Sequence, residues 1–170
     1  KGNLFEGGIR VPFVMQWPAK VKGGQIYNNP VISLDIFATS KALTSPNIVS
    51  KNELHGVNLI PFLTGEKNHA PHDNLFWRNN LMQNDPNLRV EASAVRNQKF
   101  KFIKNKEAVA LYDLKNDISE KNDIKNQEIE VYNKLVNDHK EWLKTLKDPI
   151  FLGLIANKEY NRLNPGRFKY

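Results

Sequence analysis

The sequence contains no cysteine among its 170 residues. Disulfides, cysteine-ligated zinc and a cysteine nucleophile are therefore excluded within this segment, although the cellular compartment is not fixed by that absence. The sequence also lacks any apolar run approaching the ~20 residues that a membrane-spanning helix needs, so we expect no membrane span. It shows no signal peptide, but it begins in the middle of a sequence feature, and we expect it to be a fragment that cannot show one.

A net charge of +7 is the main compositional bias. The lysines are scattered through polar stretches and do not form one block, which argues against nucleic acid as a partner. Aromatic residues interleave with lysines only at residues 99–102, Lys-Phe-Lys-Phe. A strand with one wet and one buried face explains that pattern equally well. An anionic substrate is compatible with the charge.

The opening loop holds Glu6, Arg10 and a pair of glycines, which permit a close approach between backbones. Ile9 to Trp17 is apolar except for Arg10 and Gln16, which predicts a strand buried on both faces. α/β enzymes often place site residues on such polar loops attached to buried strands.

Two helical segments follow in the sequence. The first is predicted to begin after Ser33, a candidate N-cap, and to present one face made of Leu34, Phe37, Ala38, Lys41 and Ala42. Asp35 falls in its first turn, where a carboxylate favours the helix dipole, so we assign it a structural role. Residues 57–63 predict one or two further helical turns.

His69 and His72 lie in a loop between residues 66 and 73. A metal site needs three or four converging ligands, and no third ligand lies nearby in the sequence. We therefore predict a solvent-facing pair of histidines.

From residue 75 the pattern of apolar residues changes to a period of two residues, which is typical of strands. Leu75 to Trp77 predicts a short strand, and residues 92–96, 99–103 and 109–114 predict further strands joined by short turns. Closely spaced strands of this kind indicate an antiparallel meander with one solvated face, on which Lys99 and Lys101 would lie.

The clearest helix is predicted over residues 126–147, where apolar residues recur at intervals of three and four. Asn126 is its candidate N-cap, Glu130 and Lys134 form a favourable pair, and His139 lies at the edge of its apolar stripe. The helix is expected to cover the meander, and the remaining tail shows no clear periodicity. The fold class predicted for this segment is α+β.

No complete catalytic constellation can be assembled from these residues. The sequence contains no phosphate-binding glycine loop, no acidic cluster with calcium-loop spacing and no nucleophile elbow.

The opening residues, Lys1 to Phe13, closely resemble the Lys-x-x-x-(Phe/Tyr)-Glu-Gly-Gly-x-Arg-x-Pro segment of the formylglycine-dependent sulfatases. The resemblance continues in order along the chain. Residues 17–20 (Trp-Pro-Ala-Lys), 31–39 (Val-Ile-Ser-Leu-Asp-Ile-Phe-Ala-Thr), 55–65, 94–103 and 111–124 (starting Leu-Tyr-Asp-Leu) are similar to further sulfatase segments. Ala38 and Ile118 stand where proline is usual in the family, and His55 replaces an aspartate.

This resemblance implies the C-terminal portion of an α/β sulfatase of the alkaline phosphatase superfamily. Residues 1–73 would be the end of its catalytic α/β domain, and residues 74–170 a small subdomain of antiparallel sheet and helix. The formylglycine nucleophile and the calcium ligands would precede this segment, so the chain alone is expected to bind no metal and to be inactive. The resemblance also implies a periplasmic or secreted location, and a sulfated small molecule or glycan as the substrate.

Lys1 is the catalytic-site residue that the resemblance carries over, because the family lysine at this position contacts a sulfate oxygen. A compact ammonium with three donors suits that contact. We expect Glu6 and Arg10 to support the loop by pairing with each other or with backbone groups. His69, His72, Trp77 and Arg78, with neighbouring Asn79, are candidates for the substrate cleft.

Two alternatives remain open. The chain could belong to a phosphohydrolase of the same superfamily, or it could be a noncatalytic module that binds polyanions through its positive charge. If the opening strand belongs to a larger sheet whose other strands are absent, then Ile9, Val11, Phe13 and Val14 should be more exposed than their pattern intends.

Overall fold

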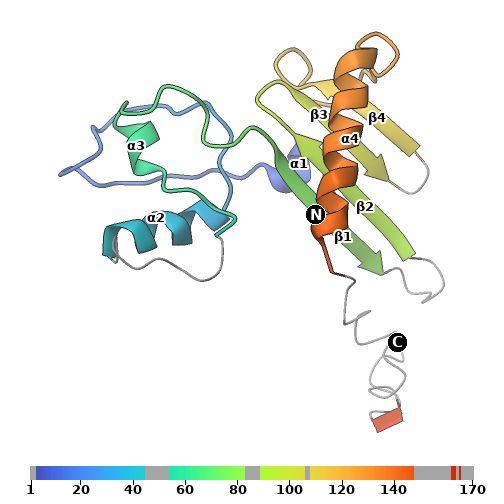
Figure 1. Cartoon of the computed structure of the whole chain (residues 1–170), viewed down its shortest axis with the longest axis horizontal. Helices are drawn as coiled ribbons and strands as arrows, with labels where there is room; N and C mark the ends of the chain where they lie inside the picture. Colours follow the sequence, from blue (N-terminus) through green and yellow to red (C-terminus); the bar gives the residue numbers. More distant parts are fainter. Residues whose placement is uncertain are drawn as a thin grey trace. The chain divides into compact units, whose positions relative to one another are not determined.

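The computed structural model describes residues 3–44, 54–82, 89–105, 108–147, 162, 163 and 165. Lys1, the predicted sulfate contact, lies outside these residues. The chain forms two compact units (Figure 1). Residues 3–10 belong to the same unit as the sheet, and Val11–Leu75 is the second unit.

The first unit is built on a four-stranded antiparallel sheet with the strand order β1-β2-β3-β4. Its strands are β1 (Leu75–Met82), β2 (Arg89–Arg96), β3 (Phe100–Asn105) and β4 (Ala108–Asp113). The predicted meander is therefore confirmed, and the predicted turn at residues 97–98 is the β2–β3 connection. Asn97 stabilises that turn, because its side-chain oxygen accepts hydrogen bonds from the backbone N–H groups of Lys99 and Phe100.

Side chains cover both faces of this sheet. One face carries a buried cluster of Val95, Phe100, Phe102 and Leu111, packed against Leu135 of α4 (Ile129–Thr145). Figure 1 shows α4 lying along the sheet. The other face carries Ala92, Ala94, Ile103, Tyr112 and Leu114, packed against Leu4, with Phe5 and Ile9 beside it. The prediction of one solvated face was wrong, because the opening residues of the chain cover the second face.

Helix α4 confirms the predicted C-terminal helix and its role as the cover of the meander. Its N-cap is Glu128, not Asn126, and Lys134 pairs with Asp138, not with Glu130. His139 is buried at 3% exposure, with its ring 5.3 Å from that of Phe102. The imidazole therefore belongs to the core under α4.

The opening apolar segment does not form the predicted strand. Glu6–Ile9 is a single helical turn, α1, and the segment from Arg10 to Trp17 has no regular secondary structure. A strand buried on both faces needs hydrogen-bonded neighbours, and the described part of the chain supplies none here. As expected, Val11, Phe13 and Val14 are exposed, at 73%, 48% and 89%. Ile9 instead packs on the sheet, so the exposure predicted for it was wrong.

The second unit contains α2 (Leu34–Thr44) and α3 (Ile60–Leu63), as predicted. Of the predicted inward face of α2, Ala38 is buried, but Leu34 and Phe37 are exposed. Asp35, Ala38 and Thr39 point inward, whereas Leu34, Ile36, Phe37 and Leu43 are exposed. The inward residues include polar groups because they bond the neighbouring backbone: Thr39 accepts from the N–H of Leu59, and Asp35 from that of Val57.

Candidate functional site

Residues 3–10 form a tight turn that is fastened to the sheet. The carbonyl of Phe5 accepts hydrogen bonds from the N–H groups of Gly8 and Ile9, at 2.7 and 3.1 Å. Leu4 is buried in the cluster on the sheet, and the Phe5 ring lies 6.3 Å from that of Tyr112. Gly8 lies against Asn3: a Cβ at Gly8 would overlap the Asn3 carbonyl oxygen and reach 3.2 Å from its carbonyl carbon. The second glycine of the pair is therefore required by close packing.

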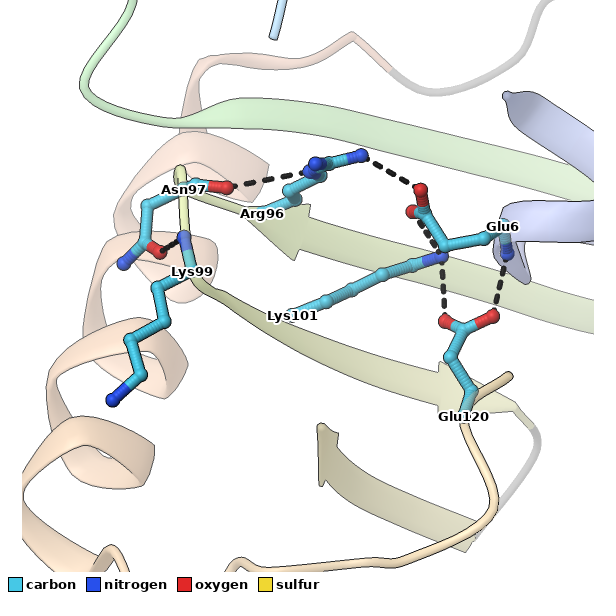
Figure 2. Close-up of polar contacts among 6 residues, drawn as sticks. All are labelled: Glu6, Arg96, Asn97, Lys99, Lys101 and Glu120. Atoms are coloured by element: carbon cyan, nitrogen blue, oxygen red, sulfur yellow. Dashed lines mark hydrogen bonds and ion pairs between the residues drawn. The ribbon is translucent and has the colours of Figure 1, made fainter. Parts of the chain in front are cut away.

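Glu6 is the polar centre of this turn. Its carboxylate is buried and bridges two cations of the sheet: Oε2 lies 2.7 Å from Arg96 Nη1, and Oε1 lies 3.2 Å from Lys101 Nζ (Figure 2). Arg96 and Lys101 are directly opposed on β2 and β3. Like charges in that position repel each other, so the Glu6 carboxylate stabilises a pair that the sheet alone would disfavour.

A second carboxylate completes the network. Lys101 has 0% exposure, and its Nζ also lies 2.8 Å from Glu120 Oε1. The other oxygen of Glu120 accepts a hydrogen bond of 2.5 Å from the backbone N–H of Glu6 (Figure 2). Glu120 therefore fixes the backbone of the turn at Glu6, and Lys101 and Arg96 bind the side chain of Glu6. Two cations and two carboxylates balance, which is the condition under which charges are tolerated in a protein interior.

This arrangement corrects two sequence predictions. The partners of Glu6 are Arg96 and Lys101, whereas Arg10, the predicted partner, is exposed. Lys101 was predicted to face solvent and is instead fully buried. Alternation along β3 placed it correctly on the face opposite Phe100 and Phe102. What the alternation does not reveal is that residues 3–10 cover that face.

The prediction that both histidines face solvent is wrong for His72. His72 Nε2 lies 2.9 and 3.0 Å from the two oxygens of Asp35, whose side chain is fully buried. Asp35 also accepts from the backbone N–H groups of Ile32 and Val57. It joins the start of α2, the segment at Val57 and the His72 loop, so its role is larger than the favourable dipole contact predicted for it. His69 is exposed, and its Nδ1 lies 2.8 Å from the carbonyl oxygen of Ala70.

The other candidate cleft residues lie on β1. Trp77 is partly buried against the cluster that includes Leu4, and Arg78 is half-buried. Trp77 therefore has a packing role on the sheet. Within the described residues, His72 and His69 belong to the second unit and Trp77 and Arg78 to the strand of the first.

Two ionisable groups near the network have shifted pKa values. Burial raises the pKa of Tyr112, and the carboxylates of Asp123, Glu120 and Asp117 raise it further, so its phenol stays neutral at physiological pH. Burial alone would raise the pKa of Asp123. Hydrogen bonds from the Leu111 N–H and from Lys125 outweigh that effect, and the pKa of Asp123 is lowered.

Metal ligation is not supported by the described ranges: in them, no three His, Asp or Glu side chains come together as a metal site. Nor does any helix in these ranges have the length and apolarity to cross a membrane.

Comparison with known families identifies the protein family to which the turn and the sheet belong. The family model for the C-terminal part of N-sulphoglucosamine sulphohydrolase matches residues 1–148. The chain belongs to this sulfatase family. The match begins at the turn, continues through the second unit and ends beyond α4.

Individual sulfatases agree with this assignment. Rat steryl-sulfatase is 36% identical over 76 residues, which is 45% of this chain and 13% of the relative. Human N-acetylgalactosamine-6-sulfatase is 38% identical over 63 residues, which is 37% of this chain and 12% of the relative. The aligned region of this chain thus spans only about an eighth of these curated proteins.

Solved structures show the same fold. Ps i-CgsB in complex with k-i-k-neocarrahexaose superposes with a TM-score of 0.70 at 23% identity, covering 89% of this chain and 33% of that one. A structure connected with the metabolism of multiple glycosaminoglycans by Bacteroides thetaiotaomicron superposes with a TM-score of 0.62 at 26% identity. The match covers 86% of this chain and 31% of that one. The chain therefore spans about a third of these two structures.

Proposed function

We propose that this chain is the C-terminal part of an enzyme that hydrolyses sulfate esters, and that the turn at residues 3–10 presents Lys1 to the sulfate group. The family match over residues 1–148 carries the proposal. The turn supports it physically, because two of its residues are fixed: Leu4 by the core, and Glu6 by its buried ion pairs. A catalytic cation needs such a rigid base if it is to meet developing charge without reorganising.

Lys1 would act on the substrate by charge and hydrogen bonding. An ammonium can donate to a nonbridging sulfate oxygen and stabilise negative charge as the ester bond breaks. The formylglycine nucleophile and the calcium ligands belong, in this proposal, to polypeptide outside the 170 residues.

The substrate class we propose is a sulfated small molecule or glycan, met in the periplasm or outside the cell. The relatives of this chain include a steryl-sulfatase and an N-acetylgalactosamine-6-sulfatase, and one similar structure contains a neocarrahexaose. His69, His72, Trp77 and Arg78 remain the candidates for selecting the group that bears the sulfate. Of these, His72 has one nitrogen bound to the carboxylate of Asp35.

The test compares the 170-residue chain with the longer polypeptide that the proposal requires, using an aryl sulfate and an aryl phosphate as substrates. The longer polypeptide should hydrolyse the sulfate, and the 170-residue chain should not. Lys1→Ala in the longer polypeptide should lower kcat by about 10²- to 10³-fold, as expected for one lost donor to a developing anion.

Lys22→Ala is the matched control, because Lys22 is exposed in the second unit and should be dispensable. Turnover by the isolated chain would contradict the need for the outside polypeptide. Preference for the phosphate would instead favour a phosphohydrolase. Salt-sensitive binding to a sulfated polysaccharide, without turnover and without dependence on Lys1, would favour a polyanion-binding module.

A further inference from the structure

The network around Glu6 contains more than a loop support needs. Arg96 alone could neutralise the Glu6 carboxylate at 2.7 Å. The chain nevertheless buries a second cation, Lys101, and then a second carboxylate, Glu120, to balance it. Burying charged groups is costly unless they are paired, so this extra pair calls for a role other than simple stability.

Glu120 reaches the network through an unusual backbone. Its φ is +55°, the one positive φ at a non-glycine among the described residues. Side chains with a Cβ adopt that region at a cost, which persists only where the surroundings enforce it. Asp117 enforces it here: its carbonyl accepts from the Glu120 N–H, and its carboxylate accepts from the N–H groups of Lys121 and Asn122. The turn formed by residues 117–122 thus directs the Glu120 side chain beneath α1.

At that position Glu120 acts on the backbone of the opening turn. One oxygen binds Lys101 at 2.8 Å and the other accepts from the Glu6 N–H at 2.5 Å. Lys101 in turn binds Glu6 Oε1. Glu6 is therefore fixed at two points, amide and carboxylate, which restrains rotation of the peptide as well as its translation. A single ion pair with Arg96 would restrain only the side chain.

We propose that Lys101 and Glu120 are positioning residues for the sulfate site, acting through Glu6 on the placement of Lys1. This inference rests on the proposed function. Neither side chain touches the substrate: both are buried below the turn, at 0% and 8% exposure. Their effect on catalysis comes from geometry, because misplacement of a catalytic group by about 1 Å can cost on the order of 100-fold in rate.

The experiment uses the longer polypeptide, with kcat measured per folded molecule well below each variant's melting temperature. Glu120→Gln keeps an acceptor for the Glu6 N–H but removes the charge that balances Lys101. Glu120→Ala removes both. We expect kcat to fall about 10-fold for Gln and up to about 100-fold for Ala. Lys101→Met combined with Glu120→Gln restores charge balance and should recover part of the loss seen with Lys101→Met alone.

The decisive readout is coupling to Lys1. If Glu120 acts through Lys1, Glu120→Gln should have almost no further effect on kcat in a Lys1→Ala background. A residue that only stabilises the fold would lower kcat equally in both backgrounds, or would not lower it per folded molecule. Asp113→Asn is the control, since it removes a partly exposed ion pair with Lys99 on the same sheet and should leave kcat unchanged.

The outcomes separate the two proposals. If the wild type hydrolyses sulfate esters and Lys1→Ala impairs it, while Glu120→Gln and Glu120→Ala keep wild-type kcat, the positioning role is overturned and the proposed function stands. Additive effects of Lys1→Ala and Glu120→Gln also overturn it. If the wild type hydrolyses no sulfate ester, the proposed function fails and the positioning role fails with it. Should Glu120→Ala not fold, Glu120→Gln carries the test.

Discussion

The two adjacent glycines of the opening turn should respond very differently to the same substitution. A Cβ on Gly7 would meet no atom within 4 Å. A Cβ on Gly8 would overlap both the carbonyl oxygen and the side-chain oxygen of Asn3. The carbonyl is backbone, so it can move only if the turn itself opens. Gly7→Ala and Gly8→Ala therefore form a matched pair with one methyl group as the only chemical change.

The expected difference follows from opposing effects. Gly7→Ala should stabilise the chain by about 0.4–1 kcal/mol, because alanine reduces the freedom of the unfolded chain and favours the helical turn. Gly8→Ala gains the same amount but adds an overlap whose relief costs about 1–3 kcal/mol in a packed structure, or more where backbone must shift. The two variants should thus differ by about 1–3 kcal/mol, and the melting temperature should change by roughly 2–4 °C for each kcal/mol.

Urea and thermal unfolding of the two variants, measured beside the wild type, test this reasoning. We expect a higher midpoint for Gly7→Ala and a lower one for Gly8→Ala, with similar slopes. Equal midpoints for the two variants would refute the close approach of Gly8 to Asn3. In the longer polypeptide, Gly8→Ala should also reduce sulfatase activity more than Gly7→Ala does, since only the former displaces the backbone that leads to Lys1.

Further predictions concern the core, a buried carboxylate and acid stability. Leu135→Ala, in the cluster under α4, should lower the free energy of unfolding by about 2–5 kcal/mol, whereas Leu43→Ala on the exposed face of α2 should change it by less than about 0.5 kcal/mol, as urea titration can show. Asp35→Ala should cost about 2–4 kcal/mol, because two backbone N–H groups lose their acceptor; an unchanged urea midpoint would contradict this. The lowered pKa of Asp123 means that its contribution is present above about pH 4 and is lost as the pH falls through the folded-state value, so the urea midpoints of wild type and Asp123→Asn should converge between about pH 5 and pH 2.

The sheet and its covering helix were predictable from the sequence because both have simple periods. Alternation identified the strands and, on β3, the separate faces of Phe100 and Lys101. The recurrence of apolar residues at three and four identified α4 to within three residues at each end. These signals are local, and the structure they specify depends mainly on neighbours in the sequence.

The errors share a different cause, which is packing between residues that are far apart in the sequence. Periodicity cannot show that residues 3–10 lie on the sheet, so Lys101 was placed in solvent and Ile9 in a strand. For α2, the spacing of large apolar residues suggested an inward face, but hydrogen bonding by Asp35 and Thr39 decided which side is buried. Within the network, only Glu6 was proposed as a site residue. A buried role for Lys101 had one available signal: it pairs with Arg96 of β2, and on the same face β2 carries Ala92 and Ala94.

The network around Glu6 also sets an order of assembly. Glu6 is separated from Lys101 by 95 residues and from Glu120 by 114. Closing so long a loop is entropically costly and tends to occur late in folding. During synthesis the opening turn emerges before β3 and the turn at Glu120, and it cannot be fixed until both have left the ribosome. Until then Arg96 and Lys101 face each other across the sheet without a carboxylate between them. The opening turn is thus completed only after these later segments, and a truncation anywhere before residue 120 would leave the turn without its backbone anchor.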